Sequence, residues 1–330
     1  MKTKHSNLLK LLAPLIAIVH LCSCNKDDVP GQNKEIQVSA NTRDTIVYVN
    51  VDNDQVPVIL SIPESAEPMP AVVVMHGSGG LWKDDDPNTG EPSRQFEEWC
   101  QILTQNGFVC ALVGSYVPRG TPERKGKYKD PPYAFRISGE FVRPRDAYAT
   151  LEMLRGLHNP DGSKVVRGKD AGILGFSHGG NAVAATLYDT SLTPKDWKWT
   201  QSFDGKDYDT SSGVRAPANK PEDGGFAAGV IYYGGSVAHG YWGGDPCSDD
   251  AMDEIIYGPY APLRHNIAED GYLAENTICL YELLKAKGFP VETKIYKDVG
   301  HGFDDDGLKQ SEEAREDTMN FFKKYLNEVD

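Results

Sequence analysis

The sequence predicts an α/β protein with a mostly parallel central sheet and helices on both faces. Short apolar runs alternate with amphipathic helical segments along most of the 330 residues, an order typical of repeated βα units. The central runs are apolar throughout, as in strands that are covered on both faces. No repeat or low-complexity segment interrupts this pattern, so we expect residues 35–330 to form one domain.

Nine strands are expected along the chain. The first three, at 36–38, 45–51 and 56–62, are predicted to lie antiparallel at one edge of the sheet. The other six follow the alternating pattern and are expected at 71–75, 108–113, 171–176, 227–233, 262–268 and 292–296.

Amphipathic helices are predicted between these strands. The first covers 94–105 and ends before Asn106-Gly107, a common stop signal. The second begins with Pro144 in its first turn and has an apolar face that continues to Leu154. Two further helices are expected at 273–287 and 308–326.

The segment Gly175-Phe176-Ser177-His178-Gly179-Gly180 carries the most informative functional signal. It follows an apolar strand and precedes a small-residue helix. A G-x-S-x-G turn in this context presents a serine at the edge of the sheet, with free amides of the helix N-terminus beside it. Ser177 is therefore the predicted nucleophile.

A serine nucleophile needs a base and an acid that orients the base. His301 lies in a glycine-flanked loop just after the last predicted strand, and it is the expected base. Asp270 follows the strand at 262–268 and fits the order Ser, Asp, His, so it is the expected acid. Other acids lie nearby and remain alternatives: Asp245, Asp249, Asp250, Asp253 and Glu269.

A glycine-rich turn, His76-Gly77-Ser78-Gly79-Gly80, follows the strand at 71–75. Such a turn can direct backbone amides toward the serine. We expect the amides of Ser78 and His178 to form the oxyanion hole, and the His76 side chain to brace the loop.

These motifs, together with residues 115–120, 145–147 and 268–270, resemble the dienelactone hydrolase family of α/β-hydrolases over roughly residues 65–305. The resemblance implies the α/β-hydrolase fold, with Ser177, Asp270 and His301 as the triad. The name-giving enzymes use a cysteine nucleophile and grip a substrate carboxylate with arginines. Here a serine stands in its place, which favours a serine esterase of the wider family.

The residues expected to contact substrate are Tyr116, Arg119 and Trp242. Asp304, Asp305 and Asp306 follow the expected base, and we expect their charge to disfavour anionic substrates. An insertion is expected at about 188–225. Its aromatic residues and Trp242 have two possible roles: they stack on a sugar or aryl group of the substrate, or they pack the insertion onto the sheet. If they stack on a sugar, the expected substrate is an acylated carbohydrate.

Residues 1–23 read as a lipoprotein signal peptide, with a basic start and an apolar stretch that ends at Cys24, the expected lipidation site. Residues 24–34 are the expected tether. This pattern predicts a lipoprotein of a Gram-negative outer membrane, facing the periplasm or the exterior and attached to the membrane by the lipid alone. Ordinary signal cleavage is the alternative.

The formal net charge of −14 argues against binding to nucleic acid or to an anionic membrane. Cys110 and Cys279 lie in apolar patterns and are interpreted as buried packing groups, although a disulfide is compatible with an oxidising compartment. We expect no metal and no organic cofactor.

The predicted function is hydrolysis of carboxylic esters through an acyl-enzyme, with an ester of small size as the partner. Two alternatives stay open. One is a serine peptidase similar to the catalytic domain of prolyl oligopeptidases. The other is a surface glycan-binding lipoprotein without catalytic activity.

Overall fold

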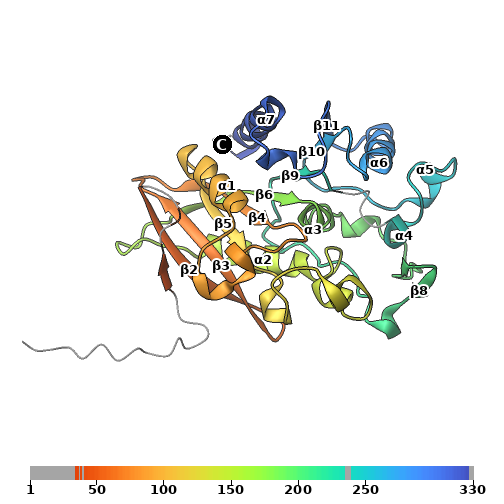
Figure 1. Cartoon of the computed structure of the whole chain (residues 1–330), viewed down its shortest axis with the longest axis horizontal. Helices are drawn as coiled ribbons and strands as arrows, with labels where there is room; N and C mark the ends of the chain where they lie inside the picture. Colours follow the sequence, from red (N-terminus) through yellow and green to blue (C-terminus); the bar gives the residue numbers. More distant parts are fainter. Residues whose placement is uncertain (1–33, 37, 39–40, 235–238, 327–330) are drawn as a thin grey trace, which may run out of the picture.

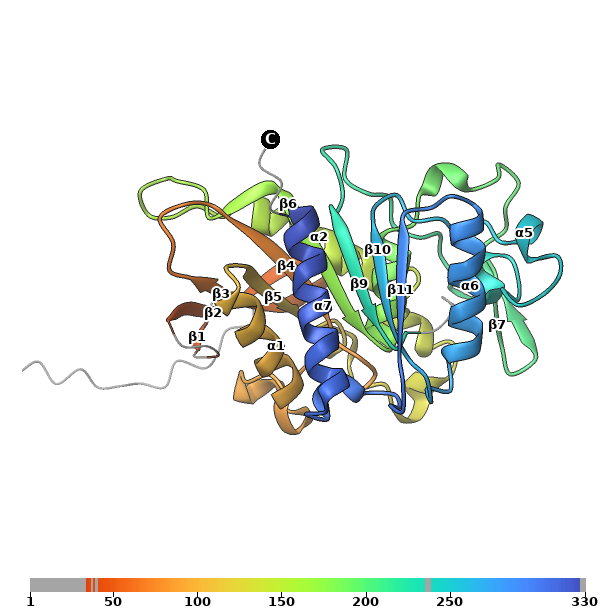
Figure 2. The same cartoon turned by 90° about the horizontal axis from the view of Figure 1, so that it is seen from above.

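The computed structural model describes residues 34–36, 38, 41–234 and 239–326. A nine-stranded sheet crosses the molecule in the order β1-β2-β3-β5-β4-β6-β9-β10-β11 (Figures 1 and 2). The strands are β1 Lys34–Ile36, β2 Thr42–Val51, β3 Asp54–Pro63, β4 Met69–Met75, β5 Val109–Val113, β6 Val166–Phe176, β9 Ala228–Tyr232, β10 Leu263–Ala268 and β11 Val291–Tyr296.

The edge strands β1, β2 and β3 pair antiparallel, and β3 also pairs antiparallel with β5. From β5 to β11 every neighbouring pair is parallel. The expected arrangement of the sheet is thus confirmed, and only the first strand is displaced, since it ends at Ile36 rather than beginning there. Parallel pairing places the carboxyl ends of β4, β6, β10 and β11 at one edge of the sheet, where ligands of such folds bind.

Helices cover both faces of the sheet, as Figure 1 shows with the sheet seen nearly edge-on. Helices α1 (Arg94–Gln105) and α7 (Lys309–Leu326) pack on one face around Trp99 and Phe322. Helices α2 (Arg143–Arg155), α3 (His178–Thr186) and α6 (Ala274–Ala286) share the other core. Two separate apolar cores on a buried sheet are what the uniformly apolar strands predicted.

One glycine in β6 permits the close approach of α7. A Cβ at Gly172 would lie 2.7 Å from the Phe322 ring and 2.9 Å from Leu326. The last helix therefore lies directly on the strand that ends at the predicted nucleophile, which fixes that strand from the side opposite α3.

The insertion forms a small hairpin of β7 (Gln201–Phe203) and β8 (Lys206–Tyr208). The nearby aromatic side chains pack on one another: the Trp242 ring lies 4.4 Å from Tyr188 and 5.2 Å from Tyr257. Trp242 is only 2% exposed. Its ring is part of the core, so the packing alternative describes it and the substrate-stacking alternative does not.

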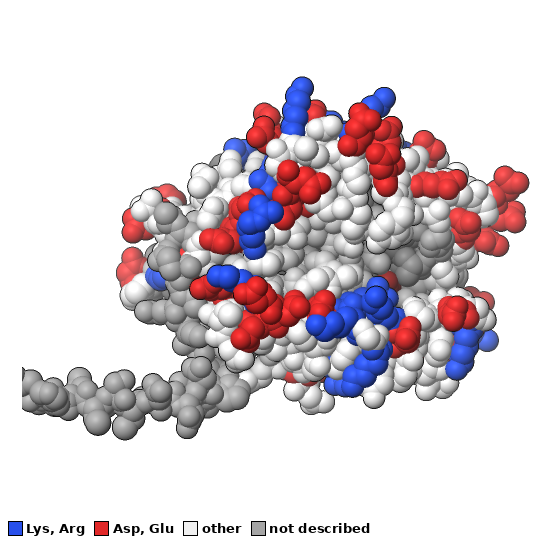
Figure 3. Space-filling model, viewed as in Figure 1, with Lys and Arg blue, Asp and Glu red and all other residues white. Residues whose placement is uncertain are grey.

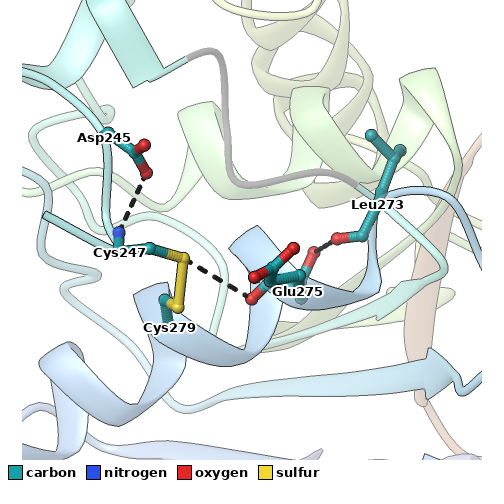
Figure 4. The surroundings of a disulfide bond; sticks show 6 residues. Asp245, Cys247, Leu273, Glu275 and Cys279 are labelled. Carbon is teal, nitrogen blue, oxygen red and sulfur yellow. Dashed lines mark hydrogen bonds between the residues drawn. A yellow bond between two sulfur atoms is a disulfide. The ribbon is translucent and has the colours of Figure 1, made fainter.

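A disulfide joins Cys247 to Cys279, with the two Cα atoms 5.2 Å apart (Figure 4). It ties the segment after α4 (His239–Trp242) to helix α6. The interpretation of Cys279 as a packing group is therefore wrong, because its apolar helix pattern cannot reveal a partner 32 residues away. Cys110 is buried and free, as is Cys100.

Among the described residues no helix is both long and apolar enough to cross a bilayer.

We expect loss of this disulfide to lower the thermal stability of the folded protein. A cross-link over 32 residues restricts the unfolded chain and contributes about 2–4 kcal/mol to the free energy of unfolding. Cys247→Ser should therefore lower Tm by several degrees in differential scanning calorimetry, and a reductant should lower the wild-type Tm but leave the variant's unchanged. Equal Tm values for both proteins without reductant would contradict the cross-link.

Candidate active site

Ser177 stands at the sharp turn between β6 and α3 in a strained conformation, with φ 51° and ψ −115°. Few non-glycine residues adopt a positive φ, and the cost is tolerated where the surroundings hold the turn in place. Here the Ser177 amide donates to the carbonyl of Tyr232 over 3.0 Å, and the amide of Gly180 donates back to the Ser177 carbonyl over 2.8 Å.

The glycines on either side of Ser177 are required by space. A Cβ at Gly175 would lie 2.3 Å from the Gly179 carbonyl oxygen, and a Cβ at Gly179 would lie 2.0 Å from that of Met75. Both distances are far inside van der Waals contact, and both involve backbone that cannot rotate away. The turn and the end of β4 therefore touch backbone to backbone, which brings the loop after β4 beside the serine.

His301 lies beside Ser177, and its Nε2 atom is 2.9 Å from the serine Oγ. Its loop follows β11 at the carboxyl edge of the sheet. The rings of Tyr233 and Tyr272 flank the imidazole, with centroids 4.7 and 4.9 Å away. This partial removal from water lowers the pKa of His301 below its ordinary value of 6.5. The neutral imidazole that a general base requires is thereby favoured at neutral pH.

Asp270 is exposed in the loop after β10. Its backbone amide donates to the Val299 carbonyl over 3.0 Å, so its loop is attached to the loop that carries His301. Within the described part of the chain its carboxylate makes no hydrogen bond to that imidazole. The neighbouring Glu269 accepts from the amide of Asp298 over 3.2 Å, which also restrains the histidine loop.

The loop after β4 approaches the serine turn closely. A Cβ at Gly77 would lie 3.3 Å from the Phe176 carbonyl and 3.6 Å from the Ser177 Cβ. The Ser78 carbonyl accepts from the Arg124 amide over 2.8 Å, whereas the amides of Ser78 and His178 have no acceptor in the described segments. An oxyanion hole needs two such free amides, and these two belong to the serine turn and to the loop that packs against it. The buried His76 ring donates from Nδ1 to the Gly77 carbonyl over 2.8 Å, as a bracing group would.

Arg143 is a buried residue of the site that the sequence analysis missed. It donates to the His76 carbonyl over 2.7 Å and lies 3.3 Å from the Nδ1 atom of His178, so it connects the two segments of the predicted oxyanion hole. The available signal was its spacing: Arg143 falls on the apolar face of Ala147, Leu151 and Leu154, where a charge is unexpected.

The tautomer of His178 follows from these contacts. An arginine can only donate, so Nδ1 of His178 is the unprotonated nitrogen and the ring proton is on Nε2. The Tyr116 hydroxyl also donates to Nδ1, over 2.5 Å. Burial, and then the charge of Arg143, lowers the pKa of His178 well below 6.5 and keeps the ring neutral. Tyr116 thus orients His178 from inside the protein, where it is almost completely buried.

Arg119 is held inside the protein. Its guanidinium donates to both carboxylate oxygens of Asp146 over 2.7 Å and to the Ser115 carbonyl over 2.6 Å, and its Nε lies 3.1 Å from Asp54. Such a bidentate ion pair fixes geometry. We assign Arg119 to anchoring helix α2 and the loop after β5 rather than to gripping a substrate.

The three acids after His301 do not form one exposed cluster. Asp304 is buried and accepts from Trp99 over 2.8 Å, from Gln95 and from the Tyr233 hydroxyl. Its burial raises the pKa of this carboxyl. Asp305 pairs with Arg94 over 2.8 Å, and of the three only Asp306 is exposed. Three exposed charges are expected from the sequence to repel anionic substrates, but only the Asp306 carboxylate is both exposed and outside these pairings.

Comparisons with solved structures place these features in a known fold. A dienelactone hydrolase-like promiscuous phosphotriesterase from metagenomic libraries aligns with 87% of this chain and 99% of its own, at 14% identity and a TM-score of 0.54. Esterase 2 of Thermogutta terrifontis aligns with 88% of this chain and 97% of its own, at 16% identity and a TM-score of 0.54. The chain has the α/β-hydrolase fold.

An acylaminoacyl peptidase of Pyrococcus horikoshii is also similar, at 15% identity and a TM-score of 0.56. The alignment covers 88% of this chain but 43% of the peptidase. No protein-family model and no curated protein matches the sequence. All three structural neighbours are hydrolases by name, and at these identities their likeness establishes the fold. Among the described residues no group of three or more histidines, cysteines and acids could hold a metal.

Substitution of Gly179 should disrupt the serine turn, because the new methyl group would overlap the Met75 carbonyl. We expect Gly179→Ala to lower the free energy of unfolding by more than 2 kcal/mol, as overpacking does in rigid surroundings, and to abolish labelling of Ser177 by a fluorophosphonate. Gly168→Ala is the matched control, since a Cβ there meets nothing within 4 Å. Equal stability of the two variants in urea unfolding would refute this account.

The pH dependence of activity should reflect the lowered pKa of His301. A base must be neutral to act, so kcat/KM should be full above the pKa and fall as pH decreases through it. The midpoint of this acid limb is expected below 6.5. Initial rates on an aryl acetate between pH 4 and 9 give this value, and a midpoint above 7 would contradict the cause assigned here.

Proposed function

We propose that this protein hydrolyses carboxylic esters through an acyl-enzyme on Ser177. The observation that carries the proposal is the 2.9 Å contact between Ser177 Oγ and His301 Nε2. It is supported by the strained turn that exposes the serine and by the two free amides beside it. The fold, which several esterases share at low identity, agrees with this chemistry but does not determine the substrate.

The reaction would begin with attack of Ser177 Oγ on the ester carbonyl while His301 takes the hydroxyl proton. The amides of Ser78 and His178 stabilise the oxyanion of the tetrahedral intermediate. His301 then passes the proton to the departing alcohol, and an acyl group remains on the serine. A water molecule, deprotonated by the same imidazole, attacks the acyl-enzyme and releases the acid.

Asp270 is our proposed orienting acid. Chain order and the attachment of its loop to the histidine loop support this assignment. The role requires a rotation of its exposed side chain toward the imidazole, and catalytic hydrogen bonds in unliganded sites often form fully only when substrate is bound. Glu269 is the nearest alternative, and its carboxylate is already occupied by the Asp298 amide.

We propose acyl groups on carbohydrates as the substrate class, and a periplasmic or surface lipoprotein attached through Cys24 as the setting. Cys24 and residues 1–23 lie outside the described residues. The Cys247–Cys279 disulfide supports an oxidising compartment, where such bonds persist. The dienelactone hydrolase family remains the proposed relationship, with a serine in place of cysteine.

A serine peptidase is the second candidate, and the similarity to acylaminoacyl peptidase favours it. A panel of N-acyl peptides tested beside aryl acetates separates the two, because an esterase cleaves only the latter. A glycan-binding protein without activity is the third possibility, and it would bind sugars without reacting with a fluorophosphonate.

Substitution of the triad should remove activity without unfolding the protein. Ser177→Ala and His301→Ala are expected to lower kcat on an aryl acetate by about 10⁴–10⁶, with far-ultraviolet circular dichroism unchanged. Asp270→Asn should cost about 10⁴ in kcat if this carboxylate holds the imidazole. Glu269→Gln is the paired variant. Should it cost more than Asp270→Asn, the acid is Glu269 and our assignment is wrong.

A further inference from the structure

An open cavity of about 200 Å³ lies beside the serine turn. It is lined by the loop after β5, the start of helix α3 and the β7–β8 hairpin of the insertion. The residues used below are Arg124, Phe135, Glu140, His178, Gln201 and Phe203.

The cavity borders the turn that carries Ser177. His178, which lines it, directly follows Ser177, and Arg124 is attached through its amide to the Ser78 carbonyl. Figure 3 shows basic side chains (blue) gathered in one patch on this face of the molecule. The loop of Arg124, residues 119–136, contributes six of the chain's lysines and arginines.

The polar groups of the cavity include donors and acceptors that the protein leaves unused. The Oε1 atom of Gln201 is buried and accepts no hydrogen bond. Glu140 is 4% exposed, and one of its oxygens accepts from the Ser138 hydroxyl over 2.6 Å. Arg124 forms no ion pair with any carboxylate of the described residues. A buried acceptor without a partner is unfavourable, and a ligand that donates to it removes that cost.

The size and walls of the cavity restrict the ligand further. Drug-sized ligands occupy about 300–1,000 Å³, so about 200 Å³ suits a single ring. The side chains of Phe135 and Phe203 supply apolar wall, and the Phe135 ring is itself held by Tyr208 at 5.4 Å. An anionic ring would face the Glu140 carboxylate. Neutral hydroxyl groups both donate and accept, so they match the arginine, the carboxylate and the amide oxygen together.

We propose that this cavity is a subsite for a neutral, hydroxyl-rich ring, one sugar unit of an O-acylated carbohydrate, with Gln201 and Glu140 accepting from its hydroxyls and Arg124 donating to them. The inference rests on the ester hydrolysis proposed above and adds the residues that select the sugar. It assigns a substrate-binding role to the hairpin of the insertion.

The test compares acetate esters that differ only in the ring. The substrates are a mono-O-acetyl methyl glucoside, cyclohexyl acetate, which has the ring without hydroxyls, and 4-nitrophenyl acetate as a measure of the reaction centre. For the wild type we expect kcat/KM on the sugar ester to exceed that on cyclohexyl acetate by at least tenfold. An acetylated methyl glucuronide should be a poorer substrate than the glucoside.

Gln201→Leu removes the unpaired oxygen at similar size. We expect it to raise KM on the sugar ester and to lower the ratio of sugar-ester to aryl-acetate kcat/KM about tenfold. Asp204→Asn, an exposed change in the same hairpin, should keep that ratio. Glu140→Gln should also lower this ratio, because the variant replaces an acceptor oxygen with a donor. Its Tm is measured alongside to show that the protein is folded.

The outcomes separate the two proposals. If the wild type hydrolyses none of the three acetates, ester hydrolysis itself is wrong. If it cleaves 4-nitrophenyl acetate but shows no preference for the sugar ring, or if Gln201→Leu keeps the ratio, the subsite is refuted while the hydrolase remains. A preference for the glucuronide would refute the neutral-ring assignment.

Discussion

The contact between the serine turn and the end of β4 is the constraint on which the site depends. At Gly179 the backbone of α3 lies so close to Met75 that no Cβ fits between them. This approach brings three things together: the strained Ser177, the free amide of His178 and the loop of Ser78. If the helix were one ångström farther away, the spacing of these groups would change by as much. The rate of such chemistry is sensitive to displacements of that size.

Buried ions hold the loops around this contact. Arg143 connects the loop after β4 to His178. The ion pair of Arg119 and Asp146 joins the loop after β5 to α2. Asp304 accepts hydrogen bonds from several donors, the Tyr233 hydroxyl among them. A buried ion pair such as Arg119–Asp146 is weak evidence for added stability, because well-packed apolar groups of the same volume often stabilise a core as well. The directional hydrogen bonds of the buried ions fix loop positions, which apolar contacts do less specifically. Burial also lowers the pKa of Arg143, a sign of how far from water this connection lies.

The sheet could be predicted from local signals, and the pairing of Ser177 with His301 from two local loop motifs together with their order along the chain. Apolar runs predict the strands, and the glycines two residues before and after Ser177 predict the turn. The pairing of the disulfide, the partners of Arg143 and the choice between the two roles of Trp242 could not be predicted, since each depends on which distant segment lies opposite. Asp270 is an intermediate case: chain order places it on the right loop, but no sequence signal determines where an exposed carboxylate points.

The aromatic cluster of the insertion connects packing with specificity. Trp199 packs against Tyr241 at 4.7 Å and stands two residues before Gln201. Packing at Trp199 therefore fixes the strand that carries Gln201 and Phe203 to the wall of the cavity. The aromatic residues need not touch a ligand to influence its binding, because they hold the side chains that line the cavity. A hairpin held in this way can change beside a common reaction centre without altering the centre, which is how one fold serves many substrates.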